Sequence, residues 1–193
     1  MTNRIVAGGA LIAAVALGAS AVAQTQKTVD RFTFVAAKAR EAGATAPDRL
    51  ELRTQRWATD AERARLVSAF KTEGVAGVAS AVREMPEAGY LDWPSYVQYV
   101  VRYAHRAPAS DGGEDIVLAI ERPIWIWWDK ALNIDSAPFT VIQLHLDKDG
   151  RGEGKVSSGA NITVGNEATG IVLQDPAKLP TLLADVQRAK NNT

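Results

Sequence analysis

The stretch that decides the fold is VQYVVRYAHRAPASDGGEDIVLAIER, which runs from Val97 to Arg122. Its first half begins with an alternation that places every second residue on one face, and isoleucine or leucine recurs at every second position of 116–120 in its second half. Between the halves lies Ser110–Gly113 (SDGG), a composition typical of a tight turn. We therefore predict an antiparallel β-hairpin here.

Further strand patterns lie on both sides of this hairpin. Phe139–Asp147 and Lys155–Val164 flank a turn rich in aspartate and glycine, so they predict a second hairpin. Shorter strands are predicted at Arg31–Val35, Leu50–Gln55 and Gly170–Gln174.

Three segments predict helices. Thr59-Asp60-Ala61-Glu62 has the spacing of a capping box, and the helix that it starts is expected to end at Gly74 in a left-handed conformation. A second helix is predicted over Val75–Met85, ending before Pro86. The apolar spacing over Leu179–Val186 predicts a short closing helix.

This order of elements predicts the fold class. Strands come first, two helices follow, and an antiparallel run completes the chain, which favours an α+β protein over a wound parallel sheet. We expect a single domain built on a curved antiparallel sheet or partial barrel, with the helix pair packed on one side.

The amino terminus predicts export. Arg4 is followed by the uncharged apolar run Ile5–Ala19 and by Ala21-Val22-Ala23, an A-x-A cleavage pattern. A retained anchor is the alternative, but the apolar run is borderline for the ~20 residues of a spanning helix. We predict a signal peptide at 1–23, a domain at 24–193, no stable transmembrane span after cleavage, and a periplasmic or secreted location.

Composition excludes several functional classes. The chain has 193 residues with 22 Lys and Arg against 22 Asp and Glu, and this balance argues against nucleic-acid binding. Cysteine is absent, which excludes disulfides, thiolate zinc sites and thiol nucleophiles. We predict no cofactor.

Motifs for catalysis and metal binding are missing. His105 and His145 are the only histidines, no G-x-S-x-G elbow occurs, and no helix carries an H-E-x-x-H pair. We therefore predict no metal site and no catalytic residue. A hydrolase using paired carboxylates stays open as an alternative, because acids flank the first hairpin at Asp111, Glu114, Asp115 and Glu121.

The least ordinary segment is Ile124-Trp125-Ile126-Trp127-Trp128. In a strand, Trp125 and Trp127 would project to one face and Trp128 to the other. A buried aromatic core is one interpretation; the other is an exposed platform that stacks on sugars, buries an apolar ligand or docks a partner. Trp93, in the predicted loop Gly89–Pro94, could extend the platform, and Arg122 could anchor an anion.

Several runs spread over the chain have a distinctive order: Arg56–Arg63 (RWATDAER), Gly89–Leu91, Arg102–Ala104, Asp111–Gly113, Arg122–Ile124, Pro138–Phe139 and Leu146–Gly154 (LDKDGRGEG). In this order they resemble an uncharacterised secreted bacterial protein family, hypothetical proteins that contain a domain of unknown function. The resemblance implies export and a single domain. It implies no activity and no catalytic residue.

The sequence as a whole predicts an exported, soluble, non-catalytic binding module. Its ligand is expected to be apolar or sugar-like, or else a protein of the envelope, with Trp93, Arg122, Trp125, Trp127 and Trp128 as contact residues. Two alternatives stay open: the hydrolase with Asp/Glu chemistry, and a structural or assembly protein that binds no small ligand.

Overall fold

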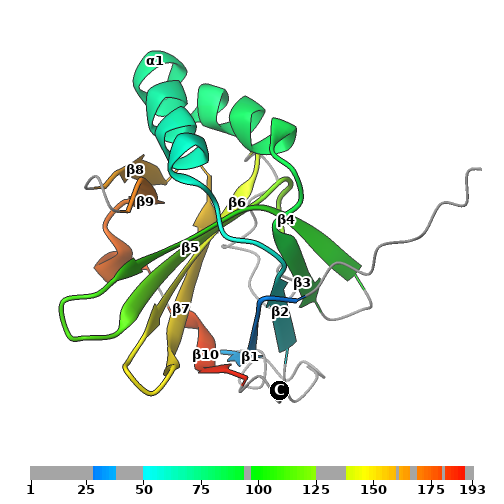
Figure 1. Cartoon of the computed structure of the whole chain (residues 1–193), viewed down its shortest axis with the longest axis vertical. Coiled ribbons are helices and arrows are strands. Elements are labelled where there is room, and N and C mark those ends of the chain that lie inside the picture. Colours follow the sequence, from blue (N-terminus) through cyan, green and yellow to red (C-terminus); the bar gives the residue numbers. More distant parts are fainter. Residues whose placement is uncertain are drawn as a thin grey trace, which may run out of the picture.

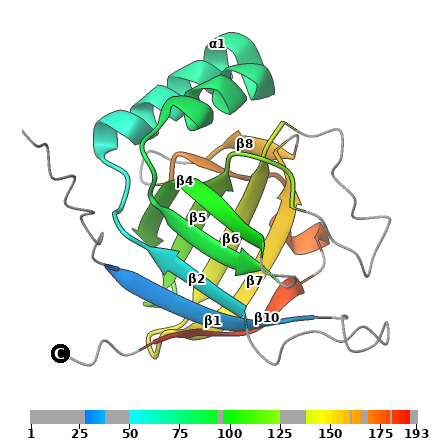
Figure 2. The same cartoon turned by 90° about the vertical axis from the view of Figure 1, so that its right-hand side faces the viewer.

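A computed structural model describes residues 28–37, 50–93, 97–124, 138–159, 161–165, 169–179 and 181–189. Eight antiparallel strands form a closed barrel in the order β1-β10-β7-β6-β5-β4-β3-β2, and β8 and β9 form a separate two-stranded sheet. One long helix, α1, lies outside the barrel (Figures 1 and 2). The strands β1 and β10 lie on the side of the barrel that faces away from α1.

The elements, in chain order, are β1 (Asp30–Ala36), β2 (Leu50–Thr54), α1 (Asp60–Glu84), β3 (Gly89–Trp93), β4 (Val97–Pro108), β5 (Glu114–Ile120), β6 (Thr140–Leu146), β7 (Arg151–Ser158), β8 (Ile162–Val164), β9 (Ile171–Leu173), the 3-10 helix η2 (Pro176–Lys178) and β10 (Thr181–Arg188). The predicted signal peptide and Trp125, Trp127 and Trp128 lie outside the described residues.

The predicted fold class is wrong. The protein is essentially all-β, a closed eight-stranded barrel with a single helix, rather than an α+β fold with a helix pair on a curved or partly closed sheet. Part of the error comes from the last element, since the segment expected to form a closing helix is the strand β10. Its pairing with β7 shifts register between Thr181 and Leu183 and again between Leu183 and Val186. These irregularities bury Leu182, Leu183 and Val186, a spacing that imitates a helix.

Two other strand predictions need correction. The segment expected to be the loop Gly89–Pro94 contains β3, which pairs with both β2 and β4. The long strand expected at Lys155–Val164 is divided, because the chain leaves the barrel after β7 and forms β8, which pairs with β9 in a separate sheet. The predicted hairpin of β4 and β5 is confirmed, with Pro108 opposite Glu114.

The helix α1 bends sharply at Gly74, whose φ of 62° and ψ of −144° are accessible to glycine but not to residues with a Cβ. Its two arms lie side by side above the barrel (Figure 1), and Arg65 of the first arm forms an ion pair with Glu84 of the second. A Cβ on Gly77 would lie 2.6 Å from the carbonyl oxygen of Ala69, so glycine allows the arms to approach. No helix in the described part of the chain has the length and apolarity needed to cross a membrane.

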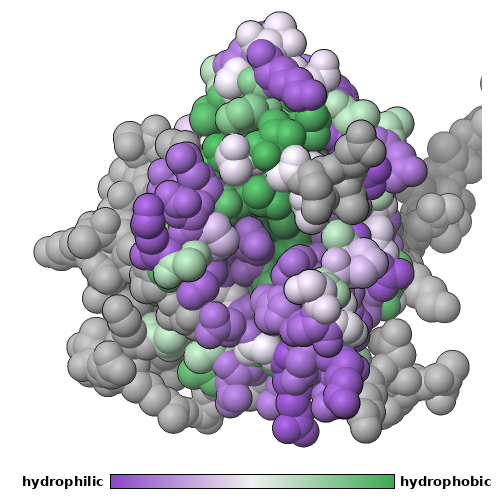
Figure 3. Space-filling view, turned by 90° about the vertical axis from the view of Figure 1, so that its left-hand side faces the viewer, coloured by the Kyte–Doolittle hydropathy of each residue, from purple (hydrophilic) through white to green (hydrophobic). Residues whose placement is uncertain are grey.

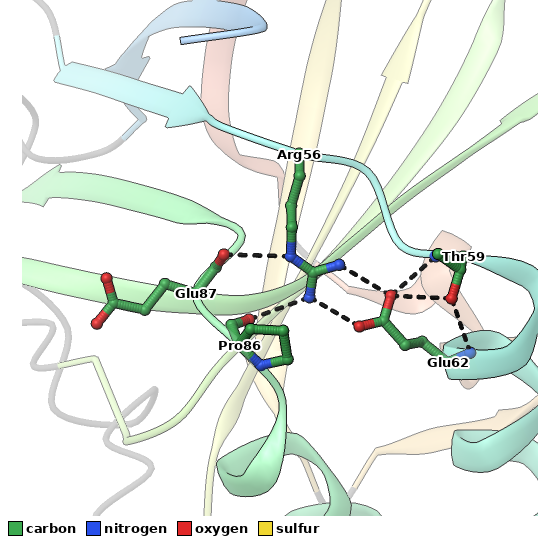
Figure 4. Close-up of polar contacts among 5 residues, drawn as sticks. All are labelled: Arg56, Thr59, Glu62, Pro86 and Glu87. Atoms are coloured by element: carbon green, nitrogen blue, oxygen red, sulfur yellow. Dashed lines mark hydrogen bonds and ion pairs between the residues drawn. The ribbon is translucent and has the colours of Figure 1, made fainter. Parts of the chain in front are cut away.

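The start of α1 is fastened by Arg56 (Figure 4). The predicted capping box is present, because Thr59 Oγ1 accepts a hydrogen bond from the Glu62 amide while the Glu62 carboxylate accepts one from the Thr59 amide. Both Glu62 oxygens also accept from Arg56, at 2.8 and 2.9 Å. The same guanidinium donates to the carbonyl oxygens of Pro86 and Glu87, which follow the end of α1. Arg56 therefore holds both ends of α1 against the barrel.

Apolar side chains gather in two layers. One fills the barrel interior, as expected for eight strands, and contains Phe32, Phe34, Leu52, Leu91, Ile116, Leu118, Ile142 and Leu144 among others. The second lies between the outer face of β4–β6 and the covering elements α1, β8 and β9, and it includes Leu66, Val82, Tyr103, Phe139, Val141 and Ile171. The candidate site lies at the edge of this outer layer.

Candidate functional site

The outer face of β4, β5, β6 and β7 carries its side chains in three rows that cross the sheet, because residues opposite one another in register share a face. The first row lies under the covering elements and contains Tyr103, Ala119, Val141 and Ser157. The second row contains His105, Val117, Gln143 and Lys155. The third contains Ala107, Asp115, His145 and Glu153. The face thus changes from apolar to polar toward the tips of the two hairpins.

A groove crosses the second and third rows. Val172 and Leu173 of β9 and Pro176 of η2 lie over the sheet beside a half-open hollow of about 170 Å³, with His105, Ala107 and Val117 on its opposite side. A second hollow of about 290 Å³ adjoins it toward His145, Glu153 and Lys155, and Asp115, Gln143 and Pro176 line both. We call these two hollows together the outer groove. In Figure 3 an apolar band runs from below the hydrophilic top of the molecule to the middle of this face, and hydrophilic surface borders it below.

His145 is held by two carboxylates at the polar end of the outer groove. Its Nδ1 lies 2.8 Å from Asp115 Oδ1 and its Nε2 lies 3.0 Å from Asp111 Oδ2. Only the doubly protonated ring can donate to both. The hydrogen bond with Asp115 raises the pKa of His145, desolvation opposes this, and the bond with Asp111 adds to the rise. The imidazolium therefore ties β6 to the β4–β5 hairpin.

This arrangement predicts a pH dependence of stability. The folded protein raises the pKa of His145 above its ordinary value, so the stabilisation is fully present below that value and is lost as the pH rises through the raised pKa. His145 and Asp111 are half exposed, so solvent screening keeps the effect small. We expect the free energy of unfolding in urea to fall between about pH 5.5 and about pH 8.5 more steeply in the native protein than in His145→Gln. Equal slopes in the two proteins would contradict a stabilising role for the imidazolium.

The geometry of the four hairpin acids does not favour the hydrolase alternative. Glu114 forms an ion pair with Arg188, and Glu121 Oε2 lies 2.7 Å from Arg102 Nε. The Gly113 amide, first of several groups, lowers the pKa of Asp111, whereas a general acid needs a raised pKa. His145 bonds to carboxylates on both sides and to no hydroxyl within the described residues, so it activates no nucleophile there.

Metal ligation has no support in the described ranges, where no group of three or more histidine or acidic side chains is arranged to hold a metal ion. His105 is buried, 8% exposed, between the apolar and polar ends of the groove. The two histidines thus line adjoining hollows of the groove and lie in different rows, His105 on β4 and His145 on β6.

Of the predicted contact residues, the structure describes the position of Arg122, which lies away from this groove. Arg122 follows the end of β5 opposite to Asp115, and about 16 Å separates Asp115 from Ile120 along an extended strand. The exposed Arg122 guanidinium lies 4.6 Å from the centre of the Tyr99 ring and donates to the carbonyl oxygen of Gln98 at 3.2 Å. Within the described residues it has no acidic partner. Trp93 ends β3 with its Cα opposite that of Val97. A ligand role for these two residues stays a prediction.

A third hollow has a different character. It is larger, about 730 Å³, and lies beside the β6–β7 turn, lined by Thr33, Asp149, Gly150, Arg151, Gln187, Arg188 and Ala189. Its Arg188 is engaged by Asp30 and Glu114. Ligand pockets are usually apolar with a few polar groups, and the outer groove fits this description better.

Comparisons with protein-family models, with curated proteins and with solved structures found no match to this chain. The site is therefore interpreted from its own geometry. Sequence analysis missed Gln143 and the residues of β9 and η2 as site residues. Asp115 lies beside His145 and Gln143 because β5 pairs with β6 across the connection 121–139, which no tight turn in the sequence indicates. The position of β9 over them has no sequence signal either.

Proposed function

We propose that this protein binds a small ligand with a ring-sized apolar part in the outer groove and does not transform it chemically. The observation that carries the proposal is the half-open hollow of about 170 Å³ between Val117 of the sheet and Val172, Leu173 and Pro176. A cavity of about 150 Å³ accommodates a benzene molecule, so this one has room for a single ring. It is too small for a helix or an extended peptide, which favours a small ligand over an envelope protein as its occupant.

Absence of catalysis is part of the same proposal. The polar side chains at the groove are paired with one another in ways that orient hydrogen bonds, as Asp115 and His145 are. A catalytic site needs a nucleophile or a proton donor with a matched pKa. We also propose that the protein acts outside the cytoplasm, as the predicted signal peptide and the resemblance to a secreted family suggest.

Filling the groove should abolish binding. We expect cyclohexanol and cyclohexanone to shift the amide resonances of Val117, Gln143 and Leu173 in a saturable way. Ala107 lines the cavity and is 4% exposed, so the ring of Ala107→Phe would occupy the ligand's place. We expect this variant to weaken binding at least about tenfold, which corresponds to about 1.4 kcal/mol. The measurement is a ¹⁵N–¹H correlation spectrum recorded during titration of the purified protein.

Two further variants control this experiment. Ala189→Phe makes the same change in the third hollow and should leave binding unaltered. Ala177→Trp adds a ring at an exposed position of η2 that lines the groove, so it narrows the groove without entering the core. Binding that survives both Ala107→Phe and Ala177→Trp would rule out the outer groove as the site.

A further inference from the structure

Two polar side chains face the outer groove with one unused hydrogen-bonding atom each. Asp115 Oδ1 accepts from His145, while Asp115 Oδ2 has no partner among the described residues. Gln143 Oε1 accepts from the Leu173 amide at 3.3 Å, which fixes the orientation of the side-chain amide and leaves Gln143 Nε2 without a partner in the described ranges. The groove therefore offers one acceptor and one donor.

These two atoms belong to neighbouring positions. Asp115 and Gln143 lie on adjacent strands and on the same face, since Asp115 is opposite His145 and Val117 is opposite Gln143. Such diagonal neighbours have Cα atoms about 7–8 Å apart, so long side chains on them can reach one ligand group. Both residues line both hollows, which places them at the boundary between the apolar cavity and the polar end.

Charges of both signs surround this boundary, which selects against a charged ligand. Asp111, Asp115 and Glu153 would repel an anion, and His145 and Lys155 would repel a cation. Lys155 lies 3.5 Å from Glu153 Oε1 and also donates to the carbonyl oxygen of Leu179. A hydrocarbon is disfavoured too, because it would cover Asp115 Oδ2 and Gln143 Nε2 without replacing their bonds to water.

We propose that the ligand of the outer groove is a cyclic polyol, a ring with neighbouring hydroxyl groups such as a pyranose sugar. A hydroxyl is neutral and both donates and accepts at one atom. Of two neighbouring hydroxyls, one can therefore donate to Asp115 Oδ2 and the other can accept from Gln143 Nε2, while the ring lies against Val117, Val172 and Leu173. This inference rests on the proposed function, since it names the ligand class of the same groove.

The test compares probes that share one ring and differ in their polar group. They are cis-1,2-cyclohexanediol, cyclohexanecarboxamide, cyclohexylamine and cyclohexanecarboxylate, with cyclohexanone as the probe that only accepts and methyl β-D-xylopyranoside as the sugar. Binding is followed by the amide resonances of Val117 and Leu173. We expect the diol to bind at least about tenfold more tightly than the carboxamide, the amine, the carboxylate and the ketone. If the xyloside binds more tightly than the diol, the better ligand is a sugar rather than a carbocyclic polyol.

Two isosteric variants test the two atoms. Gln143→Glu keeps an oxygen for the Leu173 amide and removes the donor, and Asp115→Asn keeps an oxygen for His145 and removes the free acceptor. Each should weaken diol binding at least about tenfold. Asp115→Asn should leave cyclohexanone binding within about twofold, whereas Gln143→Glu should weaken it, because the ketone oxygen can only accept and loses the donor Gln143 Nε2. The matched controls are Gln187→Glu and Asp149→Asn at the third hollow, which should change neither.

The outcomes separate this inference from the proposed function. If the ketone or the carboxamide binds as tightly as the diol, or if Gln143→Glu leaves diol binding unchanged, the polyol inference is overturned while ring binding at the groove stands. If no probe shifts the groove amides, the proposed function fails and the polyol inference fails with it.

Discussion

Gly152→Ala should destabilise the barrel severely. A Cβ on Gly152 would lie 1.8 Å from the carbonyl oxygen of His145, and it would meet backbone rather than a flexible side chain. Gly152 pairs with Leu146 in β6 and with Val186 in β10, so the sheet would have to separate at the place where β10 closes it. We expect a loss of at least about 3 kcal/mol in the free energy of unfolding, the upper end of what overpacking costs.

The measurement is thermal unfolding followed by circular dichroism. At about 2–4 °C per kcal/mol for a chain of this size, the melting temperature should fall by more than about 6 °C. Gly112→Ala is the matched control, because Gly112 has a φ of 85° and no atom within 4 Å of its Cβ position. That variant carries only the cost of a left-handed residue, about 1–2 kcal/mol. If Gly152→Ala is as stable as Gly112→Ala, close approach of β6 and β7 is not the reason for the glycine.

The glycines of this turn show what a sequence can and cannot tell. The run Asp147–Gly154 (DKDGRGEG) predicts a hairpin turn, and β6 and β7 confirm one. Only Gly150 has a positive φ, of 74°. Gly152 and Gly154 are needed for space, the latter because a Cβ would lie 2.6 Å from Leu144 Cδ2. A glycine required for a positive φ can be recognised from the local turn pattern. A glycine required because a Cβ would not fit cannot, because the atoms around it belong to strands that are distant in the sequence.

The same distinction explains the errors in the fold. The strand pairs β4–β5 and β6–β7 could be predicted, since tight turns fix their registers. Closure of the barrel could not, because it depends on β10, whose register shifts give its apolar residues the spacing of a helix. The fold class was also predicted wrongly because of α1, the bent helix between β2 and β3. Its sequence predicts two helices, whereas in the structure its two arms form one helix that covers the outer apolar layer.

Only part of the candidate site could be predicted from the sequence, namely the faces of β5 and β6 that line the outer groove. Strand alternation puts Asp115 and Val117 on one face of β5, and Gln143 and His145 on one face of β6. Their juxtaposition depends on the pairing of β5 with β6 across residues 121–139, which no tight turn fixes. The roof of the groove consists of the three-residue strand β9 and the single turn η2, which are too short to carry a periodic signal. The sequence analysis assigned ligand contacts to the tryptophan-rich segment because an unusual composition is visible in the sequence alone. A groove, in contrast, forms only where segments that are distant in the sequence meet.

Arg56→Met should lower stability by about 2–3 kcal/mol, with a fall in melting temperature of about 4–12 °C. Arg56 makes four hydrogen bonds, two with Glu62 and two with the carbonyl oxygens of Pro86 and Glu87, and its side chain is 29% exposed. Methionine keeps much of the length and removes every donor. The Glu62 carboxylate, 19% exposed, would then lose its strongest partner while staying largely covered. Arg65→Met is the matched control, since its ion pair with Glu84 is exposed and should contribute less than about 1 kcal/mol.

The pH dependence of this difference identifies its cause. The hydrogen bond from Arg56 is the largest of the effects that lower the pKa of Glu62, although desolvation opposes it. A lowered pKa means that the stabilisation is present above the ordinary value of Glu62 and is lost as the pH falls through the lowered pKa. The stability difference between the native protein and Arg56→Met, measured by urea unfolding, should therefore shrink as the pH is lowered through that range. A difference that does not vary with pH would assign the role of Arg56 to its bonds with the two carbonyl oxygens, because those do not titrate.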